Sequence, residues 1–143
     1  MTDRTTAKVT IEEFEHLAKD GSGFPDIYNF VTEEIAHGRA RMRLEFREHH
    51  VRSGGTMAGP SMMALADFAA YAALMGAIGP VQMAVTSGPS INFLRRPEAA
   101  DMVAETYLAD PNWTRLAWTK YTAEEEMTAF EGSLWTRGVS ANR

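Results

Sequence analysis

The strongest constraint on the fold is one long apolar segment in the middle of the chain. Residues 61–78 read SMMALADFAAYAALMGAI and contain a single charged residue, Asp67. The preceding Gly59-Pro60 is typical of a helix start, and the following Gly79-Pro80 is typical of a helix end. A helix that is apolar on every side must be buried on every side. The sequence therefore predicts one central helix that the rest of the chain wraps.

The same segment approaches the length of a membrane span, at 18 residues. A charged residue at its centre would be costly in lipid, and its many alanines are only weakly hydrophobic. We therefore expect a core helix and no membrane span. Residues 1–8 are polar, so we expect neither a secretory signal nor an anchor there. The absence of Cys fits a reducing compartment, and a cytoplasmic location is the expectation.

Composition also limits the partners and cofactors. The chain carries 14 basic and 19 acidic residues, for a net charge of −5, so no global field attracts it to nucleic acid or anionic lipid. Without Cys, and with four scattered His, the sequence offers no metal-ligand pattern. Gly-Xaa-Gly occurs once, at residues 21–23, without the preceding strand that a dinucleotide fold needs. We expect neither a metal nor a nucleotide cofactor.

The segments around the central helix predict one short helix and six strands. Thr10 and Glu13 match a capping box that starts an amphipathic helix. From Phe30 to Phe46 apolar and polar residues alternate, with a break at His37-Gly38 that indicates a hairpin. Four further strands are predicted at Met83–Leu94, Met102–Ala109, Trp113–Thr122 and Met127–Arg137. Short turns between them favour an antiparallel α+β fold, with a curved sheet around one helix.

The hairpin predicts a sheet with two different faces. In its second strand Ala40, Met42, Leu44 and Phe46 share one face, and Arg39, Arg41, Arg43 and Arg47 share the other. An ionised carboxylate inside an apolar helix costs several kcal/mol unless something holds it. Asp67 therefore needs either a functional explanation or a partner such as one of these arginines. The residue pattern alone leaves both open.

Two separated segments resemble a known family. Residues 58–67, AGPSMMALAD, resemble the His-Gly-Gly and Ala-Leu-Ala-Asp segment of PaaI-like acyl-CoA thioesterases, which have the hotdog fold. Residues 86–97, TSGPSINFLRRP, resemble that family's strand ending in Phe-Leu-Arg-Pro. The order of elements also agrees. The resemblance implies one hotdog domain over residues 1–143, with 1–27 as an N-terminal helix and lead-in and 28–138 as the hotdog core.

The resemblance also implies an activity. The chain would hydrolyse a small or medium acyl-CoA or aryl-CoA thioester, with coenzyme A as part of the substrate and no separate cofactor. By position, Asp67 would be the catalytic carboxylate, as nucleophile or general base, and the Gly59 N–H would polarise the thioester carbonyl. Unpaired N–H groups in the first turn of a helix suit an oxygen that gains negative charge.

Helix geometry adds a requirement for a partner copy. Gly59 and Asp67 are eight residues apart, so they lie about 12 Å apart along one helix. One thioester carbon cannot contact both residues of a single chain. Two antiparallel helices across a two-fold axis would bring Gly59 of one copy to Asp67 of the other. We therefore expect an obligate homodimer, which the family often extends to a tetramer.

Further site residues are implied less specifically. Thr86 and Ser87 lie where the family places a hydroxyl facing the pocket, and Thr86 would be the catalytic hydroxyl. Tyr71 follows Asp67 by one helical turn. Each also has a structural reading, as a strand residue or a packed aromatic. Ser61 is a candidate donor or a simple helix cap. Arg95 and Arg96 are the remaining candidates. They would bind the phosphates of coenzyme A, or they are solvated residues at the end of a strand.

Departures from the family pattern keep other functions open. Ala58 stands where the family commonly has His, Pro60 replaces the second Gly, and Arg52-Ser53 replace a polar residue that is sometimes Asn. Thr56 and the His49-His50 pair are substitute donors or ordinary loop residues. A non-catalytic acyl-CoA-binding or sensing protein is the main alternative, and a structural oligomerisation module with Asp67 in a salt bridge is another. A hotdog hydratase is disfavoured because its Asp-Xaa-Asn and His signature is not found.

Overall fold

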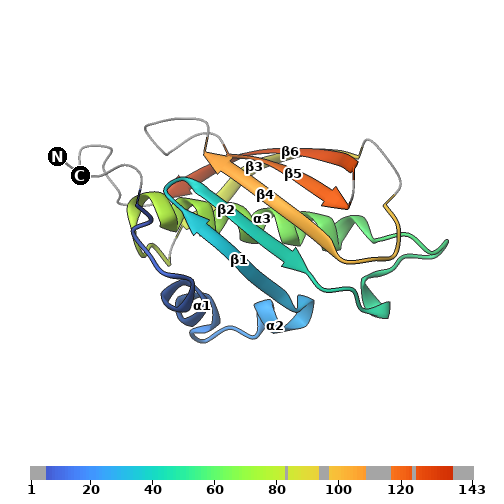
Figure 1. Cartoon of the computed structure of the whole chain (residues 1–143), viewed down its shortest axis with the longest axis horizontal. Coiled ribbons are helices and arrows are strands. Elements are labelled where there is room, and N and C mark those ends of the chain that lie inside the picture. Colours follow the sequence, from blue (N-terminus) through green and yellow to red (C-terminus); the bar gives the residue numbers. More distant parts are fainter. Residues whose placement is uncertain (1–5, 83, 94–96, 109–116, 124, 137–143) are drawn as a thin grey trace.

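A computed structural model describes residues 6–82, 84–93, 97–108, 117–123 and 125–136 of the chain, with the backbone alone for 85–93, 117–123 and 125–136. A six-stranded antiparallel sheet curves around one long helix, α3 (Gly59–Ile78) (Figure 1). The strands lie in the order β1-β2-β4-β5-β6-β3, and their bounds are β1 (Phe30–Ala36), β2 (Arg39–Leu44), β3 (Ala84–Phe93), β4 (Met102–Leu108), β5 (Ala117–Ala123) and β6 (Glu125–Thr136). This architecture confirms the predicted α+β fold and its antiparallel pairing. Residues 113–116, where a strand was predicted to begin, lie outside the described residues.

The two faces of the sheet follow the alternation in β2. Ala40, Met42 and Leu44 are fully buried, and with Met102 and Ala104 of the neighbouring β4 they form a core cluster with α3. Arg39, Arg41 and Arg43 lie on the opposite face, away from the helix. The tight turn at His37-Gly38 joins β1 to β2, and Gly38 has a φ of 72° that glycine adopts readily. The predicted hairpin and its two-faced strand are confirmed.

Helix α3 and β1 approach each other closely at one glycine. A Cβ atom at Gly76 would overlap the carbonyl oxygen of Ala36 and lie 2.9 Å from Cγ2 of Ile35. The Gly76 carbonyl also accepts a hydrogen bond of 2.8 Å from the Lys8 N–H. Together with the buried alanines of α3, this contact lets the sheet close tightly over the helix.

The N-terminal helix covers another side of α3. Helix α1 (Ile11–Lys19) begins at the predicted capping box, because Thr10 and Glu13 exchange hydrogen bonds of 2.8 and 3.1 Å. Its buried Phe14 packs against Phe68 and Tyr71, with ring centroids 5.2 and 5.8 Å apart. The helix therefore acts as a second cover over α3.

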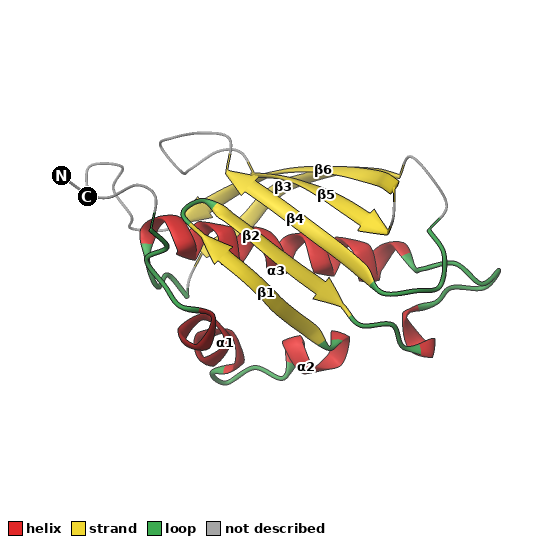
Figure 2. Cartoon of the chain, viewed as in Figure 1, coloured by secondary structure: helices red, strands yellow, loops and turns green. Residues whose placement is uncertain are grey.

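Two short helices were not predicted. Helix α2 (Phe24–Tyr28) begins after Gly23, and the 3₁₀ helix η1 (Glu48–His50) follows β2 (Figure 2). Five and three residues are too few to show a helical periodicity in the sequence. Helix α2 ends at Tyr28, and Asn29 caps it with a φ of 54° in the left-handed region.

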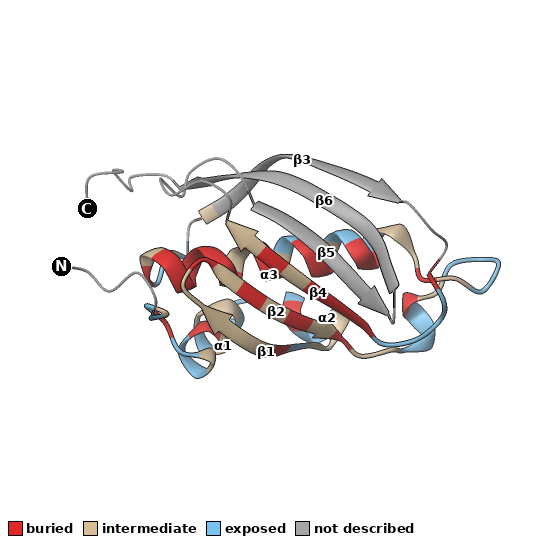
Figure 3. Ribbon diagram, turned by 45° about the horizontal axis from the view of Figure 1, so that its top comes forward, coloured by how far each residue is buried: buried red, intermediate tan, exposed pale blue. Residues whose placement is uncertain are grey.

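The prediction that α3 is buried on every side is wrong along one stripe. Pro60, Met63 and Asp67 are exposed, and Met63 exposes 40% of its surface. Figure 3 shows these exposed segments of α3 between buried ones. The sheet covers one side of the helix and α1 covers part of another, so the N-terminal half keeps an open stripe in a single chain.

By length and composition alone, α3 also passes as a candidate membrane span. Most of it is buried inside this structure. A core helix of a protein passes the same test, so the finding is weak evidence for a membrane.

The contact at Gly76 predicts a measurable penalty for one added methyl group. In Gly76→Ala, overlap with a backbone oxygen costs about 3 kcal/mol, against a gain of about 1 kcal/mol from the helix propensity of alanine. Chemical denaturation should therefore show a loss of about 2 kcal/mol in the free energy of unfolding. The control is Gly23→Ala, which has no atom within 4 Å of the added Cβ and a φ of −88°. Equal stabilities of the two variants would contradict the close approach.

Candidate active site

A glycine-containing loop delivers the chain to the start of α3. Val51 and Met57 form a β-bridge, and the Arg52 N–H donates a hydrogen bond of 2.9 Å to the Thr56 carbonyl. Gly54 and Gly55 at the tip have φ values of 100° and 78°, which side-chain-bearing residues rarely adopt. The loop therefore has a defined conformation that sets where the helix begins.

The first turn of α3 is tied to the carbonyl of His50. That oxygen accepts from the Ala58 N–H at 2.8 Å and from the Ser61 hydroxyl at 3.5 Å. The N–H groups of Ser61 and Met62 both donate to the Ala58 carbonyl, and Pro60 has no N–H. The Gly59 N–H has no acceptor among the described residues. A donor is therefore available at the positive end of the helix dipole.

Asp67 lies on the same side of α3, two turns further along. Gly59 and Asp67 belong to one continuous helix, so they are about 12 Å apart along its axis, as predicted. Asp67 is exposed, whereas Ala66 beside it is fully buried in the core cluster. The carboxylate therefore stands at the surface of the single chain and does not carry the burial penalty expected of a core position.

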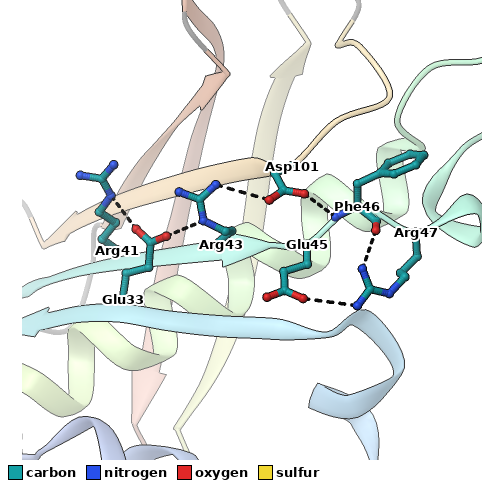
Figure 4. Close-up of polar contacts among 7 residues, drawn as sticks. All are labelled: Glu33, Arg41, Arg43, Glu45, Phe46, Arg47 and Asp101. Atoms are coloured by element: carbon teal, nitrogen blue, oxygen red, sulfur yellow. Dashed lines mark hydrogen bonds and ion pairs between the residues drawn. The ribbon is translucent and has the colours of Figure 1, made fainter.

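The arginine stripe has its own carboxylate partners on the outer face of the sheet. Arg41 and Arg43 both pair with Glu33, and Arg43 also pairs with Asp101 at 3.6 Å (Figure 4). Arg39 pairs with Glu34 at 3.7 Å. This network lies across the sheet from α3. The hypothesis that the stripe neutralises Asp67 within one chain is therefore wrong.

Two candidate hydroxyls are engaged within the protein. Ser61 is buried and donates to His50, which supports the helix start. The Tyr71 hydroxyl donates to the Gln82 carbonyl at 3.1 Å, and burial raises the pKa of this phenol. The roles of Ser61 and Tyr71 in binding substrate stay predictions. In this structure both hydroxyls donate to backbone carbonyls of the same chain.

The candidates on the second resembling segment lie on an edge strand. Among the described strands, β3 pairs only with β6, where Thr86 faces Leu134 and Ser87 faces Ser133. The register shifts between Ser87 and Ser90. The orientation of the two hydroxyls stays a prediction. Arg95 and Arg96, the predicted phosphate ligands, lie outside the described residues.

Comparisons with known proteins agree on the fold. Residues 54–108, from the loop before α3 to the end of β4, match the thioesterase superfamily. An asparagine-to-aspartate mutant of the phenylacetic acid degradation protein PaaI from Thermus thermophilus is similar in structure, with a TM-score of 0.70, 23% identity and coverage of 80% of this chain and 99% of that one. The chain has the hotdog fold, and residues 54–108 match the model of the thioesterase superfamily.

Two further hotdog structures extend this similarity. The PaaI protein of E. coli gives a TM-score of 0.74 at 16% identity, covering 90% of this chain and 94% of that one. Zebra fish thioesterase superfamily member 2 gives 0.73 at 16% identity, covering 89% and 94%. At these identities the structures establish the hotdog fold alone. No curated protein sequence matches the chain.

The sequence did not show that one of two adjacent histidines in this hotdog protein is buried. Sequence reasoning grouped His49 and His50 as loop donors, but His49 is exposed and His50 is fully buried. The His50 Nδ1 atom accepts from the Arg47 N–H at 3.2 Å, and its ring stacks on Tyr28. Its Nε2 atom is buried and has no hydrogen-bond partner among the residues that the structure describes. A histidine pair in a polar loop gave no signal of which ring turns inward.

Metal ligation finds no support within the residues that the structure describes. No group of three or more His, Asp or Glu side chains gathers there in a way that suits a metal ion. On α3, the groups that can take part in a reaction include the Asp67 carboxylate and the Gly59 N–H.

The burial of His50 predicts a dependence of stability on pH. Burial, and then the nearby His49 and Arg47, lower the pKa of His50 below its usual 6.5. The unfolded chain therefore binds this proton more readily, and the free energy of unfolding should fall as the pH drops below about 6.5. The free energy of unfolding, measured by denaturation at pH values from 7.5 to 5, should fall less in His50→Phe than in wild type. An equal fall in the free energy of unfolding in wild type and in His50→Phe would refute this assignment.

Proposed function

We propose that this protein is an acyl-CoA thioesterase whose site forms between two copies of the chain. The observation that carries the proposal is a pair of groups on one side of α3: the Gly59 N–H without an acceptor among the described residues, and the exposed carboxylate of Asp67 two turns away. One is an oxyanion donor and the other is a nucleophile or base. They are the two parts that hydrolysis of a thioester needs.

The two groups have complementary roles in the proposed reaction. The Gly59 N–H donates to the thioester carbonyl oxygen and stabilises the negative charge that develops there. Asp67 of the partner subunit either attacks the carbonyl carbon, forming an anhydride that water then hydrolyses, or removes a proton from an attacking water. In both routes a new C–O bond forms and the C–S bond breaks. The coenzyme A thiolate is a good leaving group, so it departs without a strong acid and takes up a proton afterwards.

The partner subunit is required by distance and favoured by charge. About 12 Å separates Gly59 from Asp67 in one helix, which is too far for both to contact one carbonyl group. Antiparallel helices place each carboxylate against the positive N-terminal end of the opposite α3. A homodimer with two equivalent sites follows.

The relatives support the reaction class and the kind of acyl group. The matched segment of the superfamily includes Gly59, Asp67 and Thr86. Two similar structures are PaaI proteins, and both are described as belonging to phenylacetic acid degradation. These relatives support a small or medium acyl-CoA or aryl-CoA as the substrate to test first.

Ala58 favours one competing function, a non-catalytic acyl-CoA sensor. It stands where the resembling family commonly has His, so a side-chain donor beside the carbonyl is missing. In this chain the Ala58 side chain makes no capping hydrogen bond, and the position is held by the backbone bond to His50. Binding without hydrolysis is the outcome that this alternative predicts.

The proposed role of Asp67 predicts a large kinetic effect from a nearly isosteric change. Asp67→Asn should lower kcat by roughly a hundredfold or more on the best substrate of an acyl-CoA panel, because the amide is neither nucleophile nor base. Thermal shifts with a CoA ligand should persist in the variant. Asp26→Asn is the control. Asp26 is exposed and pairs with Lys19 at 3.4 Å, so this variant should retain full activity.

The other outcomes are distinct. An inactive wild type that still binds acyl-CoA supports the sensor. If no CoA compound shifts the melting temperature, a structural module remains. Equal hydrolysis by wild type and Asp67→Asn removes Asp67 from the mechanism.

A further inference from the structure

Met63 is an exception among the methionines whose burial is described. It exposes 40% of its surface, and it lies between Gly59 and Asp67 on the open stripe of α3. Five other methionines are at most 2% exposed: Met42, Met57, Met62, Met75 and Met102. An apolar side chain therefore stands in the middle of the proposed site's helix face, where a polar residue would be the ordinary choice for water.

The positions of the three residues define a register between two helices. Gly59, Met63 and Asp67 are spaced by four residues, which is about 6 Å along the axis and about 40° around it. Suppose that Gly59 of each subunit lies opposite Asp67 of the other. The point on the helix midway between Gly59 and Asp67 is then residue 63. In an isologous contact the residue on the two-fold axis meets its own copy.

We propose that Met63 lies on the two-fold axis of the homodimer, where it packs against the partner subunit's Met63 and separates the two sites. The inference rests on the proposed function, which pairs Gly59 with the partner's Asp67. A second copy of this chain fits the stripe by charge as well as by shape. Each carboxylate meets the positive end of the opposite helix, and the apolar methionines meet between them. Methionine adapts its flexible side chain to such a contact.

A disulfide between two introduced cysteines can test whether residue 63 faces its own copy. Packed helices lie 8–10 Å apart, so Cα atoms that face each other across the axis are on the order of 5 Å apart. A disulfide bridges Cα atoms about 4.4–6.8 Å apart. The chain has no Cys, so one introduced Cys is the only thiol present.

The experiment is mild oxidation of Met63→Cys in the full chain at low protein concentration, followed by a non-reducing gel. We expect most of the protein to run as a covalent dimer. Pro60→Cys is the matched control on the same exposed stripe, because its two copies would lie about 9 Å apart along the axis. Glu12→Cys on the exposed surface of α1 measures random collision. Both controls should stay largely uncrosslinked.

A second variant tests the same contact without a thiol. Met63→Glu places two like charges across the axis, and sedimentation should show at least a tenfold weaker dimer with circular dichroism unchanged. Met63→Cys that crosslinks no more than Glu12→Cys, or Met63→Glu that dimerises as wild type, overturns the proposal.

The two hypotheses fail separately. If Asp67→Asn abolishes hydrolysis but Met63→Cys does not crosslink, the thioesterase stands and the register is wrong. If the crosslink forms and Asp67→Asn hydrolyses like wild type, the interface stands and the assigned chemistry is wrong.

Discussion

The contact between the alanine-rich side of α3 and the apolar face of the sheet determines where everything else lies. At Gly76 the helix comes so near to β1 that a single methyl group would meet the Ala36 carbonyl. Small residues along the helix keep the sheet close, and β2 and β4 supply its fully buried partners. The sheet can enclose only part of the helix circumference, and α1 encloses another part. The stripe that neither covers is the place where Asp67 and Met63 reach the surface.

The charges of the molecule are separated by the same contact. Arginines of β2 meet Glu33, Glu34 and Asp101 on the outer face, so these cations are balanced by nearby carboxylates. Asp67 lies on the other side of the sheet, on a helix with no other charged residue. In the proposed dimer, the charge that faces Asp67 is the partial positive charge of a helix end. That arrangement leaves the carboxylate close to the donor it is proposed to work with.

Much of this could be predicted from the sequence because the relevant signals are local. The capping box at Thr10, the alternation in β2 and the uninterrupted apolar run of α3 each specify an element through a few neighbouring residues. The four strands after α3 were located within a few residues for the same reason. Gly59 and Asp67 were found by resemblance. The structure adds the exposure of Asp67 and shows that the Gly59 N–H has no acceptor among the described residues.

What could not be predicted depends on packing between distant segments. The sequence of α3 is apolar all around, so nothing in it shows which stripe a curved sheet leaves open. His50 differs from His49 only in which ring turns toward Tyr28. The Tyr71 hydroxyl reads as a substrate contact until Gln82 is seen to accept from it. Such pairings are set by tertiary structure, and no local pattern encodes them.

Complementation between two inactive variants tests the shared site most directly. Gly59→Pro removes the proposed oxyanion donor at the first residue of α3, where proline is accommodated and the extended Ala58 precedes it. Mixed in equal amounts with Asp67→Asn, after subunit exchange is verified, it forms heterodimers with one intact site. A site shared between two subunits should recover about one quarter of wild-type hydrolysis, because half of the dimers are mixed and each has one working site of two. A mixture as inactive as its components would contradict it.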